Sequence, residues 1–160
     1  MEQQRLAAHN LARGQQRWHL RILQETPTQA GYTFEPSGNG RVFNNSFVFS
    51  AASLATAVNV GGNTAPSTFM FSNNNWWASD NASLSAPTLP TTETDGVSGT
   101  GTDYAGVDDD PHVNSGGAIC GGPELGGGIR IPDVDGTITG ICRSAPQTTI
   151  GPAAPESCNI

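Results

Sequence analysis

The sequence predicts an all-β protein built from short, repeated strands. Of its 160 residues, 36% are apolar and 13% are charged, and the remainder is rich in the Gly, Ser, Thr, Asn and Pro that favour turns. Apolar and polar residues alternate with a period of two in "RWHLRIL" at residues 17–23, which indicates a strand. A pair of asparagines recurs in the same setting, because "RVFNNSFVFS" and "FMFSNNNWWAS" place Asn44 and Asn73 29 positions apart (73 − 44).

The repeated apolar–Asn-Asn–polar–apolar pattern indicates a parallel β-helix, in which each coil turns a tight corner between strands. Asparagine tolerates the left-handed backbone of such a corner, and stacked asparagines pass amide hydrogen bonds from coil to coil. Phe47 and Trp76 are then expected to stack inside. The alternative is two unrelated hairpin turns in an antiparallel sandwich. The predicted corner residues are Asn44, Asn45, Asn73 and Asn74.

Three segments are predicted along the chain. Residues 1–14 form an N-terminal cap or the remnant of an earlier coil; "EQQRLAAHNLAR" suits a short helix that ends at Gly14. Residues 15–115 hold the parallel coils. Residues 116–160 are a glycine-rich C-terminal tail with short strands.

Individual strands are expected at 41–44, at 46–50, in "LATAVNVG" and in "TFMFS". The stretch 15–25 is also expected to contain a strand, with a helix as the alternative because Leu20 and Leu23 stack at helical spacing. Apolar residues are sparse between Asp80 and Asp110, which predicts long loops.

Charge excludes some partners. The net charge is −7 and the chain has no lysine, so neither nucleic acid nor an anionic membrane surface is an expected partner. No apolar run reaches membrane-spanning length. The opening "MEQQRLAAHN" lacks the apolar stretch of a signal peptide. If the protein acts outside the cell, we therefore expect this chain to have lost its own export signal.

Three cysteines are present without the spacing of a zinc site. Cys120 and Cys142 are 22 positions apart (142 − 120), about the length of one coil, and a disulfide between them is predicted. Cys158 is expected to be unpaired or to cross-link another chain. A Cys142–Cys158 bridge and three free thiols are the alternatives.

The stretches "GQQRWHLRILQET", "GRVFNNSFVF", "AVNVGGNTAPSTFMFSNNNWWASDN" and "LPTTETDGVSG" resemble the late coils of bacterial right-handed parallel β-helix repeat proteins. The closing "DVDGTITG" and "APQTTIGPAA" are similar to the end segment of such proteins, although "TIGPAAP" departs from the usual I-G-A-type strand. The resemblance covers residues 9–155. It implies a right-handed parallel β-helix segment of about three to four coils with a loop-rich C-terminal tail.

This superfamily includes pectate lyases and chondroitinase B-like enzymes, and also many surface proteins without known chemistry. The resemblance implies the C-terminal part of a secreted or cell-surface, carbohydrate-associated protein, structural or glycan-binding, without a complete active site of its own. The alternative is a polysaccharide lyase or hydrolase acting on acidic glycans. Because a β-helix buries its core between coils, the remainder of a longer β-helix or a capping partner is also expected.

The candidate ligand-binding residues are Arg17, His19 and Arg21, which alternate with apolar residues and are therefore expected on one outward strand face. Such a cationic strip suits an acidic polysaccharide, although most strips of this kind are solvated faces. Any catalytic residues of a lyase would lie on this strip or on coils outside the chain.

The acidic run "DYAGVDDDP" offers oxygen ligands for calcium, but loops of this kind are more often solvated. No metal site and no cofactor are predicted.

Overall fold

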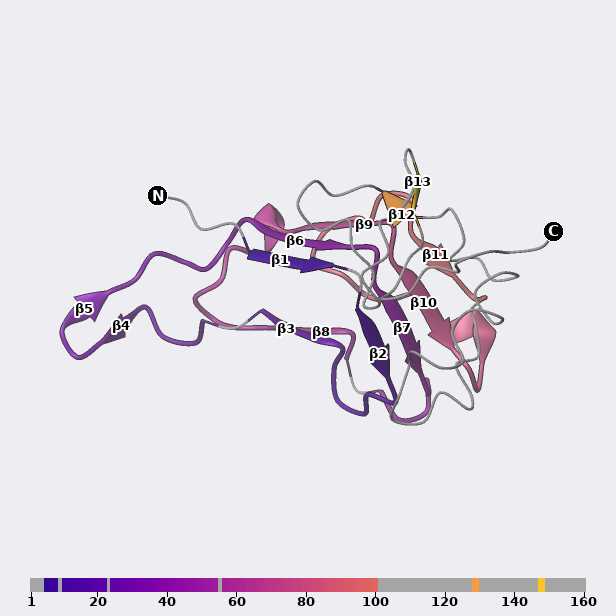
Figure 1. Ribbon diagram of the computed structural model, residues 1–160. Coiled ribbons are helices and arrows are strands. Elements are labelled where there is room, and N and C mark those ends of the chain that lie inside the picture. Colours follow the sequence, from indigo (N-terminus) through magenta and orange to yellow (C-terminus); the bar gives the residue numbers. More distant parts are fainter. Residues whose placement is uncertain are drawn as a thin grey trace.

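The computed structural model describes residues 5–8, 10–22, 24–54, 56–100, 128–129 and 147–148. Over these residues the chain is all-β, as the composition predicts, with one turn of 3-10 helix at η1 (Pro66–Thr68) and another at η2 (Ala82–Leu84). Most strands fall into three groups, and within each group they run side by side (Figure 1).

The first sheet contains β1 (Arg5–Ala8), β6 (Gly40–Phe43) and β9 (Met70–Ser72), in that order and all parallel. Its register shows where each pass of the chain begins and ends. Arg5 lies opposite Gly40, and Arg41 lies opposite Met70. The chain therefore returns repeatedly to the same sheet in the same direction. We call the stretch between paired positions on neighbouring strands one pass of the chain.

The second sheet repeats this pattern one corner further along the chain. It contains β2 (Leu11–Arg13), β7 (Ser46–Phe49), β10 (Asn75–Ala78) and β11 (Val97–Ser98), parallel and in the order β11-β10-β7-β2. Its register pairs Leu11 with Ser46, Ser46 with Asn75 and Asn75 with Val97, so each pass is shorter than the one before. The first two passes have the same lengths as in the first sheet. The two sheets thus keep one common register.

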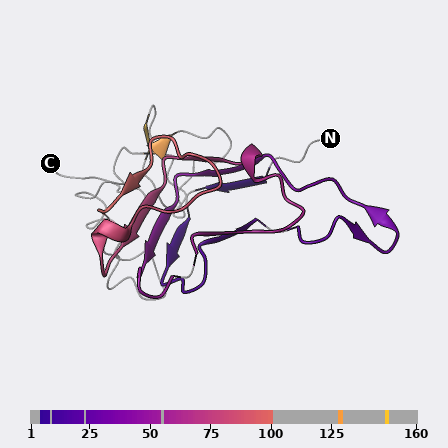
Figure 2. The same ribbon diagram turned by 180° about the vertical axis from the view of Figure 1, so that it is seen from behind.

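A third parallel pair, β3 (Leu20–Ile22) and β8 (Val58–Val60), lies across the interior from the first sheet (Figures 1 and 2). Here Leu20 lies opposite Val58, a larger offset along the chain than that between Leu11 and Ser46. The additional residues lie in the connection between β7 and β8, away from the corner that carries the asparagine pair.

The expected helix over residues 1–13 is wrong at the described positions 5–8 and 11–13, because β1 and β2 are strands. Helical propensity predicted a helix here, but β1 and β2 form ladders with β6 and β7, and such tertiary pairing overrides a weak local preference. The described residues of the segment 1–14 therefore include two strands. The helix alternative for 15–25 is wrong for Leu20–Ile22, which is β3.

Two antiparallel pairs stand outside the three sheets. In the tail, β12 (Gly128–Ile129) pairs with β13 (Gln147–Thr148). The hairpin of β4 (Thr28–Gln29) and β5 (Tyr32–Thr33) connects β3 to β6 and projects away from the body in both views (Figures 1 and 2).

The interior is filled by two neighbouring clusters of apolar side chains. Between the first sheet and the β3–β8 pair lie Ile22, Val42, Phe69 and Phe71. On the inner face of the second sheet lie Phe47, Phe49, Trp76 and Ala78. Phe47 and Trp76, which are opposite each other in register, stack with ring centroids 4.0 Å apart and planes 10° apart. Stacking along the register therefore organises the core.

Gly40 is a test of how tightly the first cluster is packed. A Cβ atom at Gly40 would lie 2.1 Å from Cε1 of the buried Phe69 ring. We expect Gly40→Ala to lower the free energy of unfolding by roughly 1–3 kcal/mol through overpacking. Gly62→Ala is the matched control, because its Cβ would meet only Glu25 O at 3.6 Å. Equal denaturation midpoints for the two variants would contradict this packing.

Candidate functional site

Asn44 and Asn73 turn the chain from the first sheet into the second. Asn44 joins β6 to β7, Asn73 joins β9 to β10, and their φ angles are 55° and 53°. This left-handed region strains most residues with a side chain but is comparatively accessible to asparagine. Both side chains are also buried. Each corner therefore has a residue suited to its backbone.

The next residue at each corner belongs to a ladder of hydrogen bonds, which we call the asparagine ladder: Asn10, Asn45 and Asn74. The backbone N and side-chain Nδ2 of Asn10 both donate to Asn45 Oδ1, at 3.1 and 2.8 Å. The same two atoms of Asn45 donate to Asn74 Oδ1, at 3.0 and 2.9 Å. Asn45 and Asn74 are 2% and 0% exposed, so the bonds between these two residues form away from water, whereas the bonds from the exposed Asn10 are partly buried.

The asparagine ladder ends on a carboxylate. The N and Nδ2 atoms of Asn74 donate to Glu93 Oε1 at 3.0 and 2.6 Å, which repeats the geometry of the earlier steps. The second oxygen of Glu93 accepts from Trp76 Nε1 at 2.6 Å. Glu93 therefore satisfies three donors from the pass that contains β10.

Glu93 accepts these hydrogen bonds although it is not the residue that lies opposite Asn74 in the strand register. Ser72 pairs with Thr94 and Asn75 with Val97, so the position equivalent to Asn74 is Gly96. A Cβ at Gly96 would lie 2.5 Å from Glu93 Cδ, so the Glu93 side chain occupies the space where a fourth ladder asparagine would project. The absence of a side chain at Gly96 is what makes room for Glu93.

Burial raises the pKa of Glu93, while the hydrogen bonds from Asn74 and Trp76 act in the opposite direction. A raised carboxyl pKa favours the protonated form in the folded state. The contribution of Glu93 to stability is therefore greatest in acid and falls as the pH rises through its folded pKa.

Sequence reasoning identified two of these corners and missed the others. Asp95 has a φ of 53°, like Asn44 and Asn73, and precedes Gly96 as they precede their ladder residues. The sequence signal for this corner is the dipeptide "DG", which favours a turn. It follows the second "NN" by one pass that is shorter than the previous one. Asn10 was missed because it follows a histidine, so no asparagine pair marks the first corner.

On the outside of the molecule, Arg17 and Arg21 are exposed and flank the half-buried Trp18. Their guanidinium carbons lie 5.3 and 4.7 Å from the centroid of its ring. Both distances are in the range of cation–π attraction. The three side chains form a compact cationic and aromatic cluster, which we call the Arg–Trp cluster (Arg17, Trp18 and Arg21).

The prediction that His19 shares the outward face of Arg17 and Arg21 is wrong. The His19 ring lies 4.6 Å from Phe49 and 5.0 Å from Phe47, centroid to centroid, and it also contacts Trp76. The regular strand begins only at Leu20, so the alternation of side chains does not extend back to residue 17. Trp18 is outward and His19 inward as a result.

His19 is half-buried, and its two ring nitrogens lie inside without polar partners. Both ring nitrogens are inaccessible and make no hydrogen bond in the described structure. Burial lowers the pKa of His19 to about 4. The imidazole is therefore neutral at pH 7 and acts as an aromatic core side chain.

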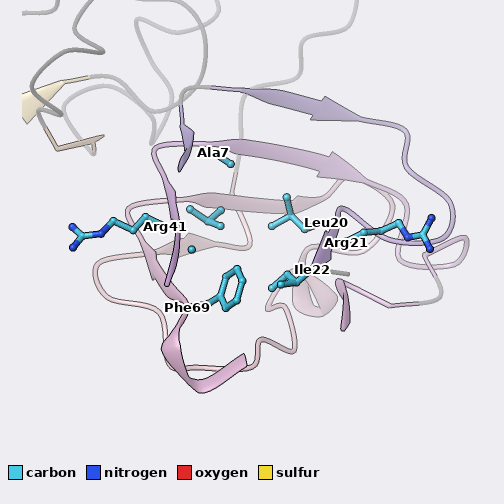
Figure 3. Close-up of a pocket in the computed structure, with 8 residues that line it drawn as sticks. Ala7, Leu20, Arg21, Ile22, Arg41 and Phe69 are labelled. Carbon is cyan, nitrogen blue, oxygen red and sulfur yellow. The ribbon is translucent and has the colours of Figure 1, made fainter. Parts of the chain in front are cut away.

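A partly open cavity of about 140 Å³ lies between the first sheet and β3 (Figure 3). Its apolar wall is formed by Ala7, Leu20, Ile22, Val42 and Phe69. Arg21 and Arg41 also border it, and in Figure 3 their side chains extend to opposite sides.

The remaining predicted residues lie outside the described part of the chain. They are Cys120, Cys142, Cys158 and the acidic run from Asp103 to Asp110. Among the described residues, no group of three or more His, Cys, Asp or Glu side chains is placed to hold a metal ion.

The chain matches no protein-family model, no curated protein and no solved structure. In the described residues, none of the helices has the length and apolar character needed to cross a bilayer.

We expect Asn74→Asp to destabilise the protein strongly at pH 7. The change replaces the Nδ2 atom, which donates to Glu93 and to Val42 O, by an oxygen that repels both. The expected loss in the free energy of unfolding is roughly 3 kcal/mol, recovered in part below pH 5 as one carboxylate is protonated. Urea denaturation at both pH values measures it. Asn63→Asp, at a surface hydrogen bond, should have little effect.

We expect His19 to make the protein less stable in acid. Its folded pKa is about 4 and its ordinary value is 6.5, so the unfolded chain binds the proton first and stability falls between those pH values. The loss is roughly 3 kcal/mol at most. His19→Phe keeps the ring contacts and should flatten the stability profile over this window. Parallel pH profiles for both proteins would contradict the assignment.

Proposed function

We propose that this chain is a segment of a right-handed parallel β-helix from a secreted or cell-surface, carbohydrate-associated protein. In this proposal the segment is structural and glycan-binding, and it carries no complete active site of its own. The observation that carries the proposal is the common register of the first two sheets, where each of the first three passes of the chain adds one parallel strand to both.

Two further features support a coiled arrangement. In two passes the strands are joined by corners with the left-handed asparagines Asn44 and Asn73, and the asparagine ladder links three consecutive passes. Side chains of the same register position also stack, as Phe47 does on Trp76. These contacts join each pass to the next, as expected for a solenoid whose repeats contact only their neighbours. The right-handedness rests on the resemblance of the sequence to bacterial β-helix repeats.

The Arg–Trp cluster is the proposed glycan site. The two guanidinium groups, held over the ring of Trp18, can pair with the carboxylates of an acidic polysaccharide. His19 does not belong to this site, because its nitrogens are buried among aromatic rings. It therefore does not support the alternative of a lyase with its base at this strip.

The glycan proposal predicts that Arg17→Ala and Arg21→Ala each weaken binding to oligogalacturonate. Loss of one exposed ion pair costs about 1 kcal/mol, or roughly a fivefold increase in Kd. Arg41→Ala removes the same charge from another exposed position and should leave the Kd unchanged. Isothermal titration at two salt concentrations measures both affinity and its electrostatic part. Equal effects of all three variants would contradict a specific site.

A further inference from the structure

The β4–β5 hairpin and its flanks, residues 25–36, form an arm that no other described part of the chain buries. Every residue of this arm is exposed, including Tyr32 at 70% and Phe34 at 45%. An isolated two-stranded hairpin is at best marginally stable in water. Large exposed aromatic side chains on such an element indicate a surface that binds another molecule.

The tip of the arm is strained. Ala30 and Gly31 form the turn between β4 and β5, with φ angles of 51° and 83°. Glycine adopts this geometry readily, whereas the left-handed conformation costs alanine roughly 1 kcal/mol. The backbone bond from Phe34 N to Pro27 O, at 2.7 Å, holds the base of the hairpin.

The cavity of Figure 3 has the dimensions and chemistry to receive one of these rings. Its volume of about 140 Å³ is close to that of an engineered apolar cavity of roughly 150 Å³ that binds benzene. Its wall is apolar, and the exposed cations Arg21 and Arg41 stand on either side. The arm carries the opposite charge, because Glu25 and Glu35 lie on its two legs beside the aromatic residues.

Arm and cavity lie on the same part of the molecule. The arm leaves the body after Ile22 and returns at Gly40, and both residues line the cavity. A twofold axis near this region would let two copies exchange arms, so that the same patch is used twice. We propose that the chain self-associates in this way: Phe34 of each copy enters the cavity of the other, and Glu25 and Glu35 lie against its arginines. Arg21 also belongs to the Arg–Trp cluster, but this inference concerns self-association and does not rest on glycan binding.

Sedimentation velocity over a dilution series up to about 1 mM tests the proposal. The full chain is expected to show a monomer–dimer equilibrium. Phe34→Ala should weaken the dimer by about tenfold or more. Leu84→Ala, which removes an exposed apolar side chain elsewhere, should leave it unchanged. Circular dichroism shows whether each variant keeps its fold.

Charge exchange tests the pairing. Glu35→Arg and Arg41→Glu should each weaken the dimer by about tenfold, and the double variant should recover most of that loss. Ala30→Asn, which relieves the strained turn and preorganises the arm, should tighten the dimer by a fewfold.

Three outcomes would overturn the proposal. One is a monomer at every concentration, including the case in which the arm folds onto the cavity of its own chain. The second is a dimer that Phe34→Ala does not weaken. The third is a failure of the charge-exchanged double variant to recover. Loss of glycan binding in Arg17→Ala leaves all three readouts unaffected, so the two proposals fail separately.

Discussion

The hydrogen-bonded ladder from Asn10 through Asn45 and Asn74 to Glu93 is the constraint on which the described fold depends. At each step a backbone N–H and a side-chain N–H converge on one oxygen of the next pass. A shift in register by one residue would take both donors away from that oxygen, and at the buried Asn45 and Asn74 each donor left without a partner costs roughly 1–3 kcal/mol. The ladder therefore holds the first and second sheets in one common register. It also explains why the corners contain asparagine, which supplies both a donor and an acceptor.

The all-β character and the central corners could be predicted because they depend on local chemistry. Asn44 and Asn73 have equal surroundings, and the stretch from one to the other is a true pass of the chain. The pass before it is longer and the pass after it is shorter, so no fixed period led to Asn10 or Asp95. His19 was misplaced because alternation was extended beyond the ends of β3. Local propensity predicts a helix at the first strands because their partners, β6 and β7, are distant along the chain and do not enter a local preference.

The size of the interior side chains changes from pass to pass. At one register position the first pass carries Ala7 and the second Val42, and the cavity opens beside them. At another position Ala12 precedes Phe47, and the ring of His19 packs close to Phe47. Ala12 thus leaves space that the ring of His19 fills, whereas the space beside Ala7 stays partly open as the cavity. This difference determines where the described core offers a surface to a ligand.

The asparagine ladder also has a direction. Each amide receives through its oxygen and gives through its nitrogen, so the dipoles of successive side chains add, and their positive end faces Glu93. An ionised carboxylate has no proton to give, so it can accept from the ladder but cannot extend it. An acidic residue at an inner step would divide the array into two opposed halves, whereas at the last step it matches the accumulated polarity. The type of polar residue at each step, amide or carboxylate, therefore specifies which pass comes last in the stack.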